Sequence, residues 1–257
     1  MLLAIDAGNT NITFALFDGK KRKSSWRIKT DASRSADEYV VFLAKLFELG
    51  GFEFSQVKDC IISSVVPDAN FSLRLMCHSA FNAKPIFIGK DIKNLGLNIK
   101  LDKPEEIGSD RIVNAIAVLT YYEAPAVVVD FGTATTFDVI DKDGAYLGGA
   151  IAPGVNLSLN ALHQAAAKLP KISVSRPEKA IGTNTITAMQ SGIYYGYTAL
   201  VSGMITRLKS ELKGKPTVLA TGGLAPLFKG DIPEIDKIDE DLTLKGLLSI
   251  YTRHKKK

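Results

Sequence analysis

The amino-acid sequence predicts an α/β protein made of two related units. Its first residues indicate short strands joined by tight turns, and helices and strands alternate after them. A similar order of strand, small-residue turn and strand begins again at Ala126. Asp6 and Asp130 end the corresponding strands and stand 124 positions apart, close to half of the 257 residues. We therefore expect two domains, over residues 1–115 and 116–257.

The first half is expected to begin with a strand hairpin. Apolar residues 2–5 and 12–17 flank a small-residue turn, and Asp18-Gly19 is typical of a second tight turn before a strand over 24–28. Ser35 and Glu38 form a capping box, which predicts a helix over 36–49 ended by Gly50-Gly51. A strand over 59–66, a helix opened by Pro67 and a strand over 84–89 follow.

The second half is expected to repeat this order. A helix over 109–122 joins the halves directly, because no Pro- or Ser-rich linker separates them. Strands over 127–130 and 136–140 come next, with a turn at Asp143-Gly144. A long helix over 184–212, a strand over 217–220 and an amphipathic helix over 242–251 complete the chain.

The composition is that of an ordinary globular protein, with 46% hydrophobic and 23% charged residues. A net charge of +5 raises the question of a nucleic-acid partner. Binding of a nucleic acid, however, requires cations clustered on one face. Arg253, Lys255, Lys256 and Lys257 are expected to form a terminal tail, and without them 28 basic residues face 27 acidic ones. The run from Lys20 to Lys23 is expected at a hairpin tip. We expect solvated charges and no nucleic-acid partner.

The sequence also predicts a cytoplasmic protein without a membrane partner. The longest apolar stretches, such as 124–129, are far shorter than the roughly 18 residues that cross a bilayer. No basic region precedes the first apolar run, so a signal peptide is not expected. Cys60 and Cys77 are isolated thiols, which are more typical of core or reduced residues than of a disulfide.

Two turns of similar sequence are candidate ligand-binding sites. Asp6-Ala7-Gly8-Asn9-Thr10-Asn11 and Asp130-Phe131-Gly132-Thr133-Ala134-Thr135 each follow a buried strand. Glycine lets a phosphate approach the backbone, N–H groups and hydroxyls donate to its oxygens, and an aspartate can hold a divalent cation. Each turn alone is also an efficient hairpin, but the pair favours a nucleoside triphosphate. A third turn, with Gly222 and Gly223, suits backbone contact with adenine or ribose.

Further motifs occur in an order that resembles the type III pantothenate kinases. They are Gly108-Ser109-Asp110-Arg111, Gly149-Ala150-Ile151-Ala152-Pro153-Gly154, Asn184-Thr185 and Ala188-Met189-Gln190-Ser191-Gly192, together with the three turns. The resemblance covers nearly the whole chain. It implies two ribonuclease-H-like domains of the acetate and sugar kinase, heat-shock 70 and actin superfamily, with an ATP cleft between them. It also implies phosphorylation of pantothenate to 4′-phosphopantothenate, the first step of coenzyme A biosynthesis.

The resemblance implies a role for each matching residue. Asp110 is the general base, Asp6 ligates Mg²⁺, and Asp130 holds a monovalent cation, K⁺ or NH₄⁺. The predicted ATP contacts are Asp6, Ala7, Gly8, Asn9, Thr10, Asn11, Ile12, Thr13, Thr133, Gly222 and Gly223. The predicted pantothenate contacts are Gly108, Ser109, Asp110, Arg111, Thr185 and Leu101. Family membership further implies a homodimer, for which the apolar segment 189–208 is a candidate interface.

Two positions depart from the family pattern. Leu101 stands where many members have a tyrosine, and Ser109 replaces the usual alanine and adds a hydroxyl. Two other functions therefore stay open. One is that of a catalytically silent member that acts as a regulatory or accessory factor, and the other is that of a kinase for another small hydroxylated acceptor. The complete set of Asp6, Asp110, Asp130 and Thr133 favours an active enzyme over the silent member.

Overall fold

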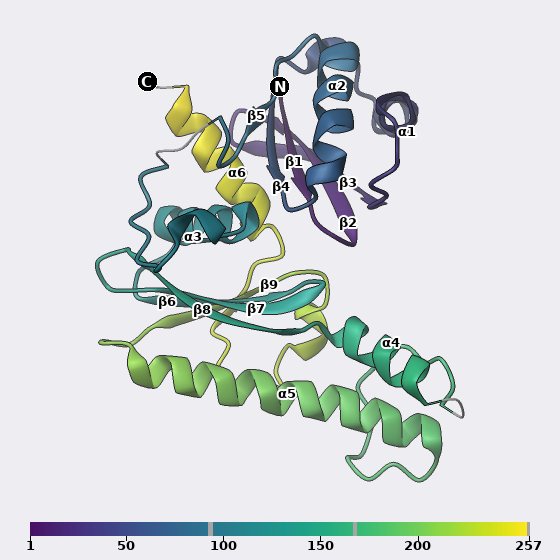
Figure 1. Cartoon of the computed structure of the whole chain (residues 1–257), viewed down its shortest axis with the longest axis vertical. Helices are drawn as coiled ribbons and strands as arrows, with labels where there is room; N and C mark the ends of the chain where they lie inside the picture. Colours follow the sequence, from purple (N-terminus) through teal and green to yellow (C-terminus); the bar gives the residue numbers. More distant parts are fainter. Residues whose placement is uncertain (92–94, 167–168, 256–257) are drawn as a thin grey trace. The chain divides into compact units, whose positions relative to one another are not determined.

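The computed structural model describes residues 1–91, 95–166 and 169–255, which form two compact units (Figure 1). Unit 1 comprises Met1–Leu97, Glu105–Thr120 and Thr243–Lys257, and unit 2 comprises Asn98–Pro104 and Tyr121–Leu242. The sequence analysis assigned the whole of 116–257 to the second domain. In the structure the last helix instead packs on the sheet of the first unit, because its leucines complete a hydrophobic cluster there.

Unit 1 contains a five-stranded mixed sheet with the order β3-β2-β1-β4-β5. β1 pairs antiparallel with β2 and parallel with β4. The strands are β1 Leu2–Ala7, β2 Asn11–Asp18, β3 Lys21–Lys29, β4 Asp59–Ser64 and β5 Ile86–Phe87. Alternate residues of β1 therefore face opposite sides of the sheet, and both sides carry buried apolar residues.

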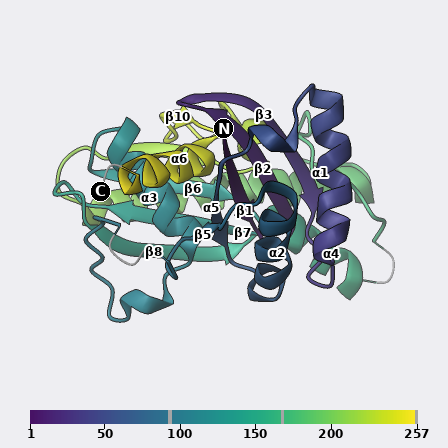
Figure 2. The same cartoon turned by 90° about the horizontal axis from the view of Figure 1, so that it is seen from above.

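Helices cover both faces of this sheet. Leu3 and Ile5 belong to a cluster with α1 (Ala36–Gly50) and α2 (Asn70–Phe81), which lie side by side in both views (Figures 1 and 2). Leu2 and Ala4 point the other way and pack with α3 (Ser109–Tyr121) and α6 (Leu242–His254). The sheet is thus the middle of a three-layer arrangement. Short 3₁₀ helices at Phe54–Gln56, Pro67–Ala69 and Pro104–Glu106 connect its elements.

Unit 2 contains a second five-stranded sheet, with the order β10-β9-β6-β7-β8. Its strands are β6 Ala126–Phe131, β7 Ala134–Ile140, β8 Tyr146–Pro153, β9 Thr217–Thr221 and β10 Lys237–Ile238. One face packs on α4 (Val155–Ala165), on α5 (Thr185–Glu211) and on the 3₁₀ helix Ala225–Phe228. The central β6 pairs antiparallel with β7 and parallel with β9, as β1 does with β2 and β4.

The first hairpins of the two sheets are similar, and the turn of the second is one residue shorter. Asp6 pairs with Thr13 across β1 and β2, and Asp130 pairs with Thr136 across β6 and β7. In each turn the glycine N–H donates to a nearby carbonyl, from Gly8 to Asn11 at 3.0 Å and from Gly132 to Ala134 at 3.1 Å. The prediction of two related α/β units is confirmed.

Most expected helices and strands are present, with four corrections. The strand expected over 84–89 is limited to β5, and α6 continues to His254, so Arg253 belongs to a helix rather than to a tail. Only Gly19 and Lys20 form the expected hairpin tip, since Asp18 pairs with Lys21. The fourth correction is that β8, α4 and β10 were not expected as elements. Lys256 and Lys257 of the predicted tail lie outside the described residues.

Cys60 and Cys77 are both buried free thiols, as expected of core residues. None of the helices in the three described ranges combines the length and the apolar character of a membrane span.

Candidate active site

The first candidate region is the turn between β1 and β2. The hydroxyl of Thr30 donates to the Gly8 carbonyl at 2.6 Å, and the Thr30 N–H donates to the Thr10 carbonyl at 2.9 Å. The chain just beyond β3 thus fixes the turn on both of its sides. Thr30 was missed by the sequence analysis, because it lies 22 positions from Gly8 and belongs to no motif.

The predicted ATP contacts of this turn divide into two groups. Asn9, Thr10 and Asn11 are exposed. The side chains of Ala7 and Ile12, by contrast, lie in the core against α1 and α2. For these two residues only the backbone is available to a ligand, and their apolar character is explained by packing.

A second candidate region of unit 1 is the start of α3. The Arg111 N–H donates to the Asp110 Oδ1 atom at 2.8 Å. The same oxygen lies 2.5 Å from the point where a Cβ atom on Gly108 would be, so the carboxylate folds back over Gly108 and a larger residue there would displace it. Asp6 follows Leu2 and Ala4 in the alternation of β1, so its side chain faces the α3 side of the sheet. Unit 1 therefore carries Asp6 and Asp110 on one side of its sheet.

In unit 2, Asp130 corresponds to Asp6, and two glycines lie next to its carboxylate. Asp130 pairs with Thr221 across β6 and β9. The Oδ1 atom of Asp130 lies 2.5 Å from the Cβ position of Gly222 and 3.5 Å from that of Gly132. Gly222 also has a φ of +90°, which disfavours every other residue. These two glycines thus add no side chain of their own beside this carboxylate.

The backbone of Gly154 packs closely against the exposed turn that contains Thr133. A Cβ atom on Gly154 would lie 2.1 Å from the Thr133 carbonyl oxygen and 2.8 Å from that of Gly132. The backbone therefore approaches the turn more closely than any other residue would allow. Gly154 is also the N-cap of α4, so this contact positions the helix relative to the turn.

Leu101 and Thr185 come from other elements of unit 2. Leu101 extends a short pairing of residues 98–100 with Tyr146, and its Cδ2 atom lies 3.1 Å from the Cβ position of Gly148 on β8. That strand is separated from β6 by β7, so Leu101 is not part of the Asp130 turn. Thr185 is the exposed first residue of α5, which Asn184 caps through the Thr187 N–H at 3.0 Å.

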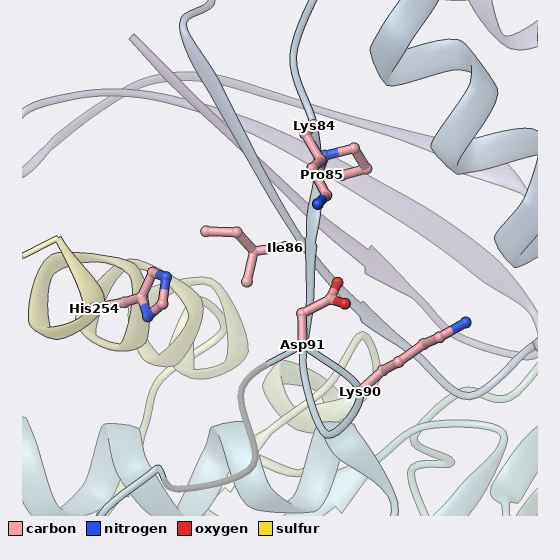
Figure 3. A pocket seen from close by; sticks show the side chains of 6 residues that line it. All are labelled: Lys84, Pro85, Ile86, Lys90, Asp91 and His254. Atoms are coloured by element: carbon pink, nitrogen blue, oxygen red, sulfur yellow. The ribbon is translucent and has the colours of Figure 1, made fainter.

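Two surface pockets contain no predicted site residue. The first, of about 500 Å³, lies in unit 1 between Ile86 of β5 and His254 of α6 (Figure 3). Lys84, Lys90 and Asp91 complete its rim, and in this view Lys90 points away from His254. The second, of about 200 Å³, lies in unit 2 around Phe228 and Ile238. The predicted ATP contacts instead lie mainly in turns at the ends of β1, β6 and β9, which is where α/β sheets bind ligands.

Two tyrosines with raised pKa values stabilise the fold and lie outside the candidate site. Burial and the Asp239 carboxylate raise the pKa of Tyr122 to about 12, and the Tyr122 hydroxyl donates to Asp239 Oδ2 at 2.7 Å. Burial and Asp231 likewise raise the pKa of Tyr194 to about 12, and its hydroxyl donates to Asp231. These pairs join α5 and the chain after α3 to loops of unit 2, and neither includes a predicted site residue.

The carboxylates present suit a metal held mainly by phosphates. Among the described residues no group of three or more His, Cys, Asp or Glu could hold a metal ion alone. Mg²⁺ in nucleotide sites is commonly held by one or two carboxylates together with phosphate oxygens and water. Asp6 at the end of β1, beside an exposed turn rich in N–H and hydroxyl groups, fits that donor set.

Comparison with known proteins gives a full-length match. The family model described as type III pantothenate kinase matches residues 2–207. A type III pantothenate kinase from Paramagnetospirillum magneticum is 52% identical over 254 residues, covering 99% of this chain and 98% of that protein. One from Rhodospirillum rubrum is 51% identical over 254 residues, covering 99% of each.

Solved structures share the fold at low sequence identity. A Campylobacter jejuni protein described as a Baf family transcriptional activator has a TM-score of 0.64 at 19% identity, covering 99% of this chain and 100% of that chain. The activator of 2-hydroxyisocaproyl-CoA dehydratase from Clostridium difficile, with bound ADPNP, has a TM-score of 0.53 at 14% identity, covering 99% and 94%. With the two equivalent sheets, this likeness confirms the predicted class of two ribonuclease-H-like domains.

Proposed function

Because the chain belongs to the type III pantothenate kinase family, we propose that it transfers the γ-phosphoryl group of ATP to the terminal hydroxyl of pantothenate. The product, 4′-phosphopantothenate, begins coenzyme A biosynthesis. The observation that carries this proposal is the 52% identity over 99% of the chain. The presence of Asp6 and Asp110 on the same side of one sheet supports an active rather than a silent member.

Asp110 is the general base of the proposed reaction. Its Oδ1 atom is oriented by the Arg111 N–H, which leaves the second oxygen to accept the proton of the acceptor hydroxyl as the new P–O bond forms. Gly108, Ser109 and Arg111 adjoin it at the start of α3. The planar guanidinium of Arg111 suits the pantothenate carboxylate. Thr185 and Leu101 are further proposed pantothenate contacts.

The turns carry the proposed ATP contacts. Backbone N–H groups and the hydroxyls of Thr10, Thr13 and Thr133 suit phosphate oxygens, and Gly222 and Gly223 suit the ribose or adenine. Asp6 is the proposed ligand of Mg²⁺, which neutralises developing phosphate charge. Phosphoryl transfer then depends mainly on how these groups position the two substrates.

A monovalent cation, K⁺ or NH₄⁺, is proposed at Asp130. The close approach of Gly132 and Gly222 brings backbone next to its carboxylate, and an ion with oxygen ligands there would order the turn without competing with Mg²⁺. We expect ADP formation to be faster in K⁺ than in Na⁺, and this preference to be lost in Asp130→Asn. Equal rates in both salts for the unmodified enzyme would contradict this part of the proposal.

A homodimer through α5 is also proposed. Met189, Ile193, Tyr197 and Val201 of the apolar segment face the core, so they serve the fold of unit 2. The exposed face of α5 carries small residues, namely Gly192, Gly196, Ala199 and Gly203. Small residues let a second helix approach closely. Gly196→Trp is expected to shift the sedimentation coefficient from dimer to monomer, whereas Lys45→Trp on exposed α1 leaves it unchanged.

A cytoplasmic location is proposed because the reaction draws on cellular ATP and the two cysteines are free thiols. Cell fractionation tests it: activity with a cytoplasmic marker enzyme is expected, and activity with the membrane or periplasmic fraction would contradict it.

An ADP-release assay tests the function itself. With ATP, Mg²⁺ and K⁺ present, we expect ADP to form only when pantothenate is added. No ADP with any acceptor would favour the silent member. ADP with another hydroxylated acid but not with pantothenate would favour the alternative kinase.

A further inference from the structure

The hydroxyl of Ser109 joins the first turn of α3 to the end of β4. It donates to the Ser64 carbonyl at 3.0 Å, accepts from the Ser64 N–H at 3.1 Å, and lies 3.1 Å from the Ser63 hydroxyl. A hydroxyl has a single hydrogen. Because the Ser64 carbonyl takes that hydrogen, the Ser63 hydroxyl is the donor in the third bond. All three hydrogen bonds of the Ser109 hydroxyl are therefore made to residues of β4.

Helix formation does not require this hydroxyl. The Ile112 N–H donates to the Gly108 carbonyl at 3.2 Å, which makes Gly108 the N-cap and Ser109 the first helical residue. Serine at a helix start is usually explained by capping, but here the side chain bonds to another element. Alanine would serve the helix as well or better. The serine is thus explained by its contact with β4.

The contact fixes the place of Asp110. Asp110 follows Ser109 directly, and its Oδ1 atom is bound to the Arg111 N–H of the same turn. The Cβ position of Gly108, which lies 2.5 Å from this oxygen, is also 3.7 Å from Val65, the residue after β4. Because the carboxylate is hydrogen-bonded within its own turn, a movement of that turn relative to β4 carries the carboxylate with it.

The contact also places Asp110 relative to Asp6. Ser63 is the register partner of Asp6 across β1 and β4, so the two side chains lie on the same face of the sheet. Ser63 is fully buried, and its hydroxyl faces Ser109 on α3. Ser63, the strand neighbour of Asp6, is therefore hydrogen-bonded to Ser109, the residue before Asp110.

We propose that Ser63 and Ser109 are positioning residues that hold Asp110 at a fixed place beside Asp6. This inference rests on the proposed function, in which Asp110 accepts the proton of the pantothenate hydroxyl. Small displacements of a base reduce the rate of a positioned reaction strongly, whereas they affect ATP binding at the β1–β2 turn little. The two hydroxyls therefore act on turnover more than on nucleotide affinity.

The test is a comparison of kcat and KM in four variants. Ser109→Ala is expected to lower kcat about tenfold, with the KM for ATP within about twofold of the unmodified enzyme. Ser63→Ala removes one of the three bonds and is expected to lower kcat less. Ser109→Thr keeps the hydroxyl and is expected to restore most of the rate. Ser249→Ala is the matched control, since it removes a buried hydroxyl that donates to the Lys245 carbonyl on α6.

The outcomes separate positioning from stability and from the function itself. Ser109→Ala and Ser249→Ala are expected to lower the Tm similarly, but only the first is expected to lower kcat. An unchanged kcat in Ser109→Ala, or an equal loss in Ser109→Thr, overturns the inference. If Ser109→Ala fails to fold, an unchanged kcat in Ser63→Ala overturns it instead. An unmodified enzyme that forms no ADP with pantothenate contradicts the proposed function, which is a different result.

Discussion

Gly222 and Gly230 share a backbone conformation but not an environment. Their φ angles are +90° and +88°, so alanine is strained at both positions by about 1 kcal/mol. A Cβ atom on Gly230 meets nothing within 4 Å, whereas one on Gly222 would lie 2.5 Å from Asp130 Oδ1 and 2.7 Å from the Phe131 backbone. The requirement for glycine at residue 222 therefore comes from the approach of β6 to the turn.

These two glycines give a matched pair of variants. Gly230→Ala is expected to lower the free energy of unfolding by about 1 kcal/mol. Gly222→Ala is expected to lower it by roughly 2 kcal/mol more, because the Phe131 backbone cannot move aside cheaply. It is also expected to raise the KM for ATP. Urea unfolding and initial rates measure both effects, and equal losses in the two variants would show that the close approach is unimportant.

The sequence indicates some residues of the candidate site but not others. Asp6 and Asp130 were recognised because glycine and hydroxyl residues follow them within one turn. Thr30 and Ser63 gave no such signal, because they reach the site only when β3 and β4 pair with their neighbours. The hydroxyl of Ser109 stands out as a departure from the family pattern, but its partners follow only from the packing of α3 against β4.

At the scale of elements, the capping motif predicted the start of the first helix. The box of Ser35 and Glu38 is present, with bonds of 3.3 Å to the Glu38 N–H and 2.8 Å to the Ser35 N–H, and α1 starts at Ala36. β8 was missed because Gly148 and Gly149 interrupt its apolar alternation. A Cβ atom on Gly149 would lie 1.7 Å from the Phe137 carbonyl oxygen, so this strand depends on pairing with β7 rather than on strand propensity.

The last helix is held to the first sheet by a charged contact. Asp59 of β4 accepts from the Tyr251 hydroxyl at 2.6 Å and from the Lys255 ammonium at 2.8 Å. Burial of the Asp59 carboxyl raises its pKa, but the hydrogen bonds from Lys255 and Tyr251 lower it by more, so the net pKa lies below the ordinary value. A lowered pKa means that the folded state favours the ionised carboxylate.

This contact predicts a pH dependence of stability. The contribution of Asp59 is present above the pKa of the unfolded chain, about 3.9, and is lost as the pH falls through the lower pKa of the folded state. Asp59→Asn is expected to lower the Tm at neutral pH, with a difference from the unmodified protein that narrows only below about pH 4. Asp143→Asn, at an exposed pair with Lys142, is the control with little effect. Narrowing already near pH 6 would contradict this account.

At the scale of the whole molecule, both ends of the chain build unit 1. Leu244, Leu247, Leu248 and Ile250 of α6 pack on the face of the sheet that β1 and β4 share. Each contributes about 2 kcal/mol by burial, and together they approach the stability of an entire domain. Periodicity predicted α6 itself, but its assignment to the first sheet depends on contacts between residues far apart in sequence.

A chain that ends at Asp241 is therefore expected to lose unit 1. Amide hydrogen exchange should show that β1 and β4 lose protection, while β6 and β9 of unit 2 keep more of theirs. A chain that lacks only Lys256 and Lys257 retains α6 and is expected to match the full chain. Unchanged protection of β1 in the shorter chain would show that α6 is dispensable.

The central claim is that Asp110, in the first turn of α3, accepts a proton while pantothenate is phosphorylated. Phosphorus NMR of the reaction measures this most directly, because it follows the phosphomonoester of 4′-phosphopantothenate as ATP is consumed. We predict that the unmodified protein forms this product, that Asp110→Asn slows it by about a thousandfold, and that Asp68→Asn, an exposed carboxylate of the same unit, does not. No phosphopantothenate from the unmodified protein, or an undiminished rate in Asp110→Asn, would contradict the account.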